Sequence, residues 1–360
     1  MIYYFIKNSQ SLSDVCHELH IENVEYLKEY HNQHCAVSER IQDDIHQGLK
    51  LYIPSSEEIR EINRKIRADN RSFYDFPHDG KFPFDFRLWE GTYQITHTVY
   101  SQGQVLTKYH HKIRLHFEGM SNNDYEFLFS VFDFSKNGTS SDTKTDTLAQ
   151  MCMDVIYPVK YKVSADGTVN EISLTRKQEE MIHELDAIKS FFPDVSSSGY
   201  IEHMKSLIKS PETISQKFKN TLLNAFMFGP VYRAGLVKWN ASETYNVFYP
   251  WIFDAHPIRF ELQNILLPKN SLEDQWLRIH EKGVASDHRS LEDLYFPDPG
   301  YDSHAEINDS SIDCEHSAEY TFKRDNYSLY SIEAVFQYFG NEISEREDFL
   351  LQRIQENDYI

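Results

Sequence analysis

Two residues near the N-terminus are spaced so that they could bind a metal ion. Cys16 and His20 lie four positions apart in a segment with helical periodicity, which would place a thiolate and an imidazole on one helix face. Only Cys35 or His34 is available nearby to complete such a site. The four cysteines form no C-x-x-C pair, which argues against a structural zinc site and against a disulfide framework. We therefore expect reduced thiols, no metal and no cofactor.

A second group of histidines lies in the segment YHHKIRLH. Strand alternation would place His110 and His111 on opposite faces. His116 would share the His110 face but lie too far along the strand to bind the same ion. Ordinary surface and core positions are expected for these side chains.

Paired carboxylates in a later segment could in principle cleave a glycosidic bond. That chemistry needs two carboxyl groups held about 5–10 Å apart in a cleft. Glu179, Glu180, Glu184 and Asp186 supply carboxylates, but they follow the pattern of a solvated helix face. The chain has no G-x-S-x-G or H-E-x-x-H motif and no glycine-rich phosphate loop. We expect a protein that is not an enzyme, with a cell-wall hydrolase as a lesser alternative.

Composition limits the partners and the compartment. The 360 residues are enough for two or three domains, and 23 Tyr with 24 Phe supply apolar surface for packed cores. A formal net charge of −20 disfavours nucleic acid as a partner. The first apolar run stops at Lys7, so no secretory signal is expected, and no window has the roughly 20 apolar residues of a membrane span. These observations predict a cytoplasmic protein.

Residues 1–54 have the pattern of a small unit with the order strand, helix, helix, strand. The run YYFIK is typical of a strand, and SQSLSDVCHELHI of an amphipathic helix with Ser11 or Ser13 as N-cap. The segment NVEYLKEYHNQ predicts a second helix. The segment IHQGLKLYIP predicts a turn at Gly48 and a closing strand that stops at Pro54.

This unit resembles the LysM family. Its closing segment, GLKLYIP at residues 48–54, matches the family's Gly-x-x-Leu-x-Ile-Pro ending. At the front, NSQSL at residues 8–12 stands where the family has a Gly-Asp-Thr-Leu turn. The resemblance implies a groove for N-acetylglucosamine polymers between the loops at residues 8–11 and 41–48. The candidate groove residues are Asn8, Ser9, Gln10, Ser11 and Gly48.

LysM modules also serve as protein-docking units in phage baseplates and contractile injection machines. The expected lack of export favours this second use. The predicted docking surface consists of Tyr4, Leu12, Tyr30, Asp43, Ile45 and Tyr52. Leu12 is expected to be the most buried of them, because it begins the apolar face of the first helix.

Residues 55–84 predict a helical linker, with Ser55 and Glu58 in capping-box spacing before a loop broken by Pro and Gly. Residues 85–360 predict an antiparallel sheet domain, in which Asp166–Gly167 marks a hairpin turn. Residues 176–229 carry the helical period and predict an insert. Its apolar end, LLNAFMFGPVY, would plug the sheet with Phe226, Met227 and Phe228 at its tip. Three further segments are expected as a polar loop at 137–147, a flexible acidic loop at 287–319 and a charged helix at 342–355.

The predicted fold class is therefore α+β, with a small βααβ LysM-like domain before a curved antiparallel sheet with a helical insertion. The element order of the larger part weakly resembles the incomplete β-barrels of lipoprotein carriers, and it implies no site residue.

The leading interpretation is a non-enzymatic cytosolic adaptor of a contractile, type VI-like secretion machine. The LysM-like unit would dock on a spike or baseplate, and the larger domain would hold an effector or another protein partner. The alternative is a protein that binds peptidoglycan or chitin oligomers.

Overall fold

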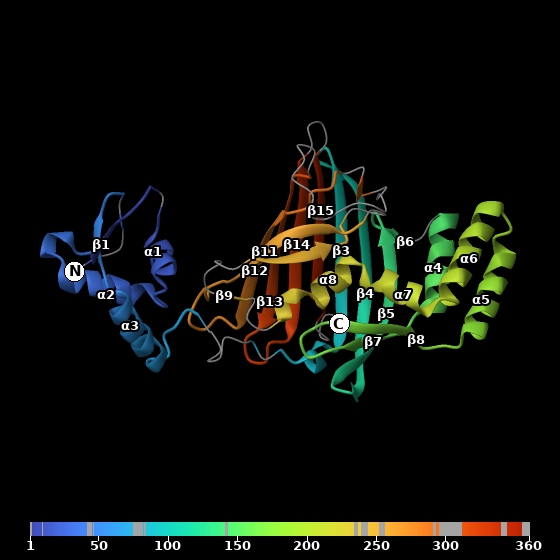
Figure 1. The fold of residues 1–360 in the computed structure, drawn as a ribbon, viewed down its shortest axis with the longest axis horizontal. Helices are drawn as coiled ribbons and strands as arrows, with labels where there is room; N and C mark the ends of the chain where they lie inside the picture. The colour runs from blue at the N-terminus through green and yellow to red at the C-terminus, as the bar shows by residue number, and fades with distance from the viewer. Residues whose placement is uncertain are drawn as a thin grey trace. The chain divides into compact units, whose positions relative to one another are not determined.

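The computed structural model divides the chain into two compact units. Unit 1 comprises Met1–His78 and Leu267–Gln275, and unit 2 comprises Asp79–Leu266 and Trp276–Ile360. Figure 1 shows both units, with labels on most of their helices and strands. The structure describes residues 2–8, 10–41, 45, 47–74, 82, 84–140, 143–233, 237–238, 244–251, 256–290, 293–294, 312–339 and 344–354.

Unit 1 has the expected order strand, helix, helix, strand, followed by a third helix. The two strands pair antiparallel, with Ile2 opposite Ile53 and Phe5 opposite Lys50. Leu51 and Ile53 pack with apolar side chains of the helices to form the core. The elements are β1 (Ile2–Phe5), α1 (Leu12–Leu19), α2 (Val24–His34), the 3-10 helix η1 (Val37–Glu39), β2 (Lys50–Ile53) and α3 (Ser56–Ala68).

Side chains at the helix starts explain where α1 and α3 begin. Ser11 is the N-cap of α1, where its hydroxyl accepts the N–H of Asp14 while the Asp14 carboxylate accepts the N–H of Ser11. Ser55 and Glu58 form the same reciprocal pair at α3, as their spacing predicts. Each box satisfies backbone donors that the first turn of a helix otherwise leaves unpaired.

Helix α3, expected as part of a linker, packs on the core of unit 1. Ile66 is fully buried in that core. Asn63 accepts the N–H of Glu22 and donates to the carbonyl of His20, which ties α3 to the turn between α1 and α2. The buried Glu22 carboxylate also pairs with Arg67. Unit 1 therefore continues past residue 54 through α3, because the side chains of α3 complete its core.

Unit 2 is built on one sheet that has 13 strands within the described residues. Its order is β10-β11-β12-β13-β14-β15-β3-β4-β5-β7-β8, with β6 paired to β5 and β9 paired to β11. All pairs are antiparallel except β9 with β11. The strands are β3 (Gly91–Ser101), β4 (Gln104–Ser121), β5 (Asp124–Lys136), β6 (Thr139–Ser140), β7 (Val159–Val163), β8 (Val169–Leu174), β9 (Val237–Lys238), β10 (Tyr245–Tyr249), β11 (Ile258–Leu266), β12 (Trp276–Ala285), β13 (Cys314–Lys323), β14 (Leu329–Phe339) and β15 (Ser344–Arg353).

The described helices of unit 2 fall mainly in the expected insert. They are η2 (Phe86–Trp89), α4 (Lys144–Ile156), α5 (Gln178–Phe191), α6 (Val195–Ile208), α7 (Pro211–Lys219), α8 (Leu222–Met227) and η3 (Pro230–Tyr232). Figure 1 shows α4, α5 and α6 grouped together, while α8 lies against the face of the sheet. The hairpin turn expected at Asp166–Gly167 joins β7 to β8, and Gly167 has a φ of +83°, which glycine adopts without strain.

The sheet curves around α8, as the apolar end of the insert predicts. Phe226 is fully buried, and its ring contacts Tyr249 of β10 and Phe349 of β15, with centroids 5.4 and 5.2 Å apart. Phe228 contacts Tyr161 of β7, with centroids 5.8 Å apart. β10 and β7 lie near opposite ends of the strand order, so α8 and its C-cap residue Phe228 can reach both only if the sheet is curved.

Three segments differ from the expectation. Residues 344–353 form β15 instead of a charged helix, because β14 and β3 supply backbone partners on both sides and Phe349 and Leu351 alternate inward. The polar segment 137–147 contains β6 and the first residues of α4. The acidic segment 287–319 ends in β13, which begins at Cys314, while its middle lies outside the described residues.

Candidate functional site

The two-stranded sheet of unit 1 turns one face away from its core. Side chains alternate along a strand, so those out of phase with the buried Leu51 and Ile53 point outward. They are Tyr3, Phe5, Lys50 and Tyr52, which we call the outer strip. Tyr3 is 54% exposed and Phe5 is 57% exposed. The Lys50 Nζ lies 4.4 Å from the Tyr3 ring centroid and 5.2 Å from that of Tyr52. The strip combines exposed aromatic area with one cation.

A buried histidine fixes the strand that carries Tyr52. The backbone N–H of Tyr52 donates to Nδ1 of His31 over 3.0 Å, and Nε2 of His31 donates to the Glu39 carbonyl over 3.0 Å. His31 is fully buried. Since both ring nitrogens are engaged, the imidazole links α2, η1 and β2. The position of β2, which carries Lys50 and Tyr52 of the outer strip, is therefore fixed by these hydrogen bonds as well as by its pairing with β1.

Two of the residues predicted for docking are held by neighbouring helices. The Tyr4 hydroxyl donates to Glu18 of α1 over 2.6 Å. The Tyr30 hydroxyl donates to Glu58 of α3 over 3.2 Å, and its ring stacks on His34 with centroids 4.2 Å apart. Both tyrosines are half-buried, and they contact different helices.

The other predicted docking residues fall at core and surface positions. Leu12 and Ile45 are half-buried and pack against the core of unit 1. Tyr52 belongs to the outer strip, and Asp43 lies outside the described residues. Tyr3 and Phe5 were missed by the prediction. Period-two alternation against the apolar Ile6 was the signal that could have identified them.

The structure brings the described parts of the predicted sugar groove together. The N–H of Gly48 donates to the carbonyl of Ile6 over 3.0 Å, so the loops before β2 and after β1 are neighbours. The Gln10 side chain donates to the hydroxyl of Tyr4 over 2.8 Å and accepts the N–H of Lys7 over 3.0 Å. Ser11 is occupied by its capping box. Asn8 is exposed, and Ser9 lies outside the described residues. A sugar would have to displace internal hydrogen bonds of Gln10 and Ser11.

Unit 2 holds a buried carboxylate on the inner face of its sheet. The Glu281 side chain is fully buried on β12. Its Oε1 accepts hydrogen bonds from the Tyr249 hydroxyl at 2.7 Å and from His316 Nε2 at 3.0 Å, and its Oε2 accepts from the Tyr245 hydroxyl at 2.9 Å. Such partners offset the cost of removing a carboxylate from water.

This network joins four neighbouring strands. Tyr245 and Tyr249 lie on β10, Asn264 on β11, Glu281 on β12 and His316 on β13. Asn264 donates to the Tyr245 hydroxyl over 2.6 Å, and its own Oδ1 is buried with no hydrogen-bond partner among the described residues. Aromatic rings enclose the network, since His316 stacks on Phe336 with centroids 4.3 Å apart. These hydrogen bonds hold β10, β11, β12 and β13 together on the inner face of the sheet.

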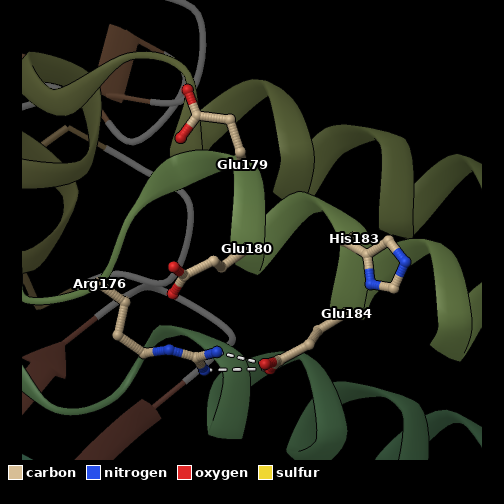
Figure 2. A pocket seen from close by; sticks show the side chains of 5 residues that line it. All are labelled: Arg176, Glu179, Glu180, His183 and Glu184. Carbon is tan, nitrogen blue, oxygen red and sulfur yellow. Dashed lines mark hydrogen bonds and ion pairs between the residues drawn. The ribbon is translucent and has the colours of Figure 1, made fainter.

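Three of the four carboxylates considered for glycosidase chemistry, Glu179, Glu180 and Glu184, line an open hollow of about 580 Å³ at α5. The fourth, Asp186, pairs with Lys205. Figure 2 shows Arg176 and Glu184 facing each other, while Glu179 points away from them. Arg176 donates two hydrogen bonds to Glu184, and these bonds lower the pKa of Glu184. A general acid needs a raised pKa, so Glu184 is unsuited to that role. His183 and Glu180 complete the lining.

The candidate metal ligands are dispersed. Within the described parts of the chain, no group of three or more His, Cys, Asp or Glu side chains could hold a metal ion. Cys16 is buried, and burial raises the pKa of its thiol to about 12. His110 contacts Thr96 and His116 pairs with Glu90, which places both on the outer side of the sheet. His111 faces inward, as its alternation predicts.

No family model matches the chain, and no curated protein matches it. A solved structure that describes lipid–protein interactions in lipovitellin has 9% sequence identity and a TM-score of 0.36, over 73% of this chain and 24% of that one. A similarity of this size does not establish a shared fold. In the described regions, no helix has the length and apolarity needed to cross a membrane.

Proposed function

We propose that this chain is a non-enzymatic adaptor that binds a protein partner through the outer strip of unit 1. The exposure of Tyr3 and Phe5 on β1, which pairs with the fixed strand β2, is the observation that carries the proposal. Large aromatic side chains are enriched where proteins bind one another, because each buries much area at a low cost in conformational entropy. The partner surface is apolar and places a carboxylate near Lys50.

The resemblance of residues 48–54 to the LysM ending supports a more specific role. In that role the chain is a cytosolic component of a contractile, type VI-like secretion machine. Unit 1 docks on a spike or baseplate protein, and unit 2 holds an effector. This assignment rests on the family resemblance.

The second candidate function is binding of peptidoglycan or chitin oligomers in the groove formed by residues 8–11 and Gly48. The proximity of the two loops favours it. The engagement of Gln10 and Ser11 within unit 1 counts against it. A wall hydrolase is a weaker third candidate, because the Glu184 carboxylate is held by Arg176.

A pull-down with the tagged full-length protein tests the adaptor proposal. The bait is incubated with cytosol of its own source, washed with high salt, and bound proteins are identified by mass spectrometry. The identified partner is then purified and its affinity measured. The double variant Tyr3→Ser, Phe5→Ser should weaken this affinity at least tenfold, because it removes the aromatic part of the outer strip.

The matched control is Val37→Ser, which alters an apolar side chain of unit 1 that is 78% exposed but lies outside the outer strip. It should bind like the wild type. Val37→Ser should keep stability within about 0.5 kcal/mol, because its side chain is on the surface. The double variant should cost about 1 kcal/mol, because it also removes the contact between Lys50 and the Tyr3 ring. If no partner is retained and the wild type instead sediments with insoluble peptidoglycan, the sugar-binding alternative replaces the adaptor.

A further inference from the structure

The two edge strands of the large sheet, β8 and β10, differ in whether their outward backbone groups have hydrogen-bond partners among the described residues. At the β8 end, helix α7 covers the outer edge of the strand. The N–H of Ile172 donates to the Ser215 hydroxyl over 3.3 Å, and the carbonyl of Asn170 accepts from Lys219 over 2.6 Å. Residues of α7 thus satisfy backbone groups that an edge strand would otherwise expose.

At the β10 edge, the hydrogen bonds of the neighbouring strand β11 determine which backbone groups of β10 point outward. The carbonyl of Arg259 on β11 accepts the N–H of Ser286, and the N–H of Arg259 donates to Asp287, so Arg259 is bonded on the β12 side. Hydrogen-bonding directions alternate along an antiparallel strand, so Ile258 and Phe260 bond toward β10.

In an antiparallel pair, two residues that lie opposite each other either both bond across the pair or both point away from it. The pairing register therefore identifies the residues of β10 that bond to β11. Val247 lies opposite Phe260 and Tyr249 opposite Ile258, so these two residues of β10 bond to β11. Asn246 and Phe248 therefore direct their N–H and C=O groups to the open edge. Among the residues that the structure describes, none bonds to these groups.

The side chains of β10 do not protect this edge. The strand reads YNVFY and contains no charge and no proline, which are the usual means of keeping a free edge from pairing. Phe248 is 58% exposed. An apolar free edge is a ready template for another extended chain.

The strand is also held in place before any partner arrives. Hydroxyl groups of Tyr245 and Tyr249 both bond to the buried Glu281, and the Tyr249 side chain is fully buried. A fixed strand loses little conformational entropy when it pairs, so more of the binding free energy remains for affinity.

We propose that β10 binds an extended segment of a protein partner as an added strand. The segment exchanges backbone hydrogen bonds with Asn246 and Phe248 and places an apolar side chain over the Phe248 ring. A basic segment is favoured, because the chain has a formal net charge of −20; the same charge opposes pairing of β10 with a second copy. The proposal rests on the adaptor function, for which it supplies the site that holds the second partner.

A defined peptide tests the proposal without knowledge of the natural partner. The probe is a fluorescent heptapeptide, Lys-Thr-Val-Thr-Val-Thr-Lys, titrated with the full-length protein and followed by anisotropy. Its control is the same peptide with N-methyl groups on alternate residues, which removes the strand-pairing hydrogen bonds. The plain peptide should bind, and the methylated one should bind at least tenfold more weakly.

Two substitutions at one position separate the backbone from the side chain. Phe248→Pro removes an outward N–H and should abolish binding, whereas Phe248→Ala keeps that N–H and should weaken binding severalfold. Hydrogen exchange should show new protection of the Asn246 and Phe248 amides in the wild-type complex. Circular dichroism of Phe248→Pro verifies folding, and the methylated peptide gives the same test without a protein variant.

Three results would overturn the proposal. The first is no binding of the plain peptide, and the second is equal binding of the two peptides. The third is a wild-type dimer that Phe248→Pro converts to a monomer, which would make a second copy the occupant. Failure of the adaptor function is distinguishable, because the variant Tyr3→Ser, Phe5→Ser leaves β10 unchanged and should bind the peptide like the wild type.

Discussion

The Oε1 atom of Glu281 lies 3.0 Å from Nε2 of His316, and both side chains are fully buried. Nδ1 of the same ring lies 3.2 Å from the carbonyl oxygen of Val335, which only accepts hydrogen bonds. Both ring nitrogens therefore face hydrogen-bond acceptors, and the imidazole bridges the Glu281 carboxylate and the Val335 carbonyl. These contacts link β12, β13 and β14. Glu281 also accepts a hydrogen bond from Tyr249 of β10, the strand proposed to bind a partner.

Removal of either member of this pair should destabilise unit 2. Glu281→Leu leaves the buried hydroxyls of Tyr245 and Tyr249 without their acceptor, and His316→Leu removes a donor from the buried carboxylate. Each change should lower the free energy of unfolding by about 3 kcal/mol. The double variant should lose less than the sum of the two single losses, because both single changes break the same Glu281–His316 hydrogen bond. All four tryptophans, at positions 89, 239, 251 and 276, fall in the ranges of unit 2, so tryptophan fluorescence in urea reports on this unit.

The matched control is Glu333→Gln on the exposed side of β14, which should change stability by less than about 0.5 kcal/mol. Strictly additive losses in the double variant would show that Glu281 and His316 do not interact.

His111 should make unit 2 sensitive to mild acid. Burial, and then the neighbouring His110 and His97, lower the pKa of His111 to about 4. Its unfolded value is about 6.5, so between these two values the unfolded chain takes up a proton that the folded chain does not. Stability should therefore fall as the pH drops from about 6.5 to about 4. His111→Gln should make this acid-induced loss of stability smaller by roughly 2 kcal/mol. This figure is below the free-energy equivalent of the full pKa difference, because the ring is partly exposed to solvent.

Urea unfolding of unit 2 at several pH values between 7.5 and 4 measures this effect. His203→Gln, at an exposed position of α6, serves as the control and should leave the slope unchanged. A His111→Gln variant with the wild-type slope would contradict the prediction.

The four cysteines should differ sharply in their reaction with iodoacetamide at pH 8. Burial raises the pKa of Cys16 to about 12 and that of Cys152 to about 11, and it also raises the pKa of Cys314. These thiols stay protonated and enclosed, and the thiolate is the reactive form. Cys35 is half-buried at the end of α2 and should be modified first.

Peptide mass spectrometry after short exposure identifies the modified positions, and the same experiment in urea should modify all four. The variant Cys35→Ser should show almost no early modification. Equal rates for Cys16 and Cys35 in the native protein would mean that the core of unit 1 opens readily.

Local sequence was sufficient to predict features that depend on neighbouring residues alone. Ser55 and Glu58 cap α3 because side-chain acceptors at the N-cap and three positions later pair with N–H groups that the helix leaves free. Gly167 forms a hairpin turn because glycine adopts a positive φ without strain. The run LLNAFMF was recognisable as a core segment from its apolar content, and Phe226 is fully buried between Tyr249 and Phe349.

Tertiary structure decided the features that depend on distant partners. Residues 344–353 could form a helix by local preference, yet β14 and β3 on either side make them a strand. Glu281 and His316 are 35 positions apart and meet only because β12 and β13 pair in one register. The outer face of β1 and the open edge of β10 likewise follow from which backbone and side-chain groups the finished sheets leave unpaired. Short-range rules describe each strand, but only the complete fold determines which of its faces and edges remain free.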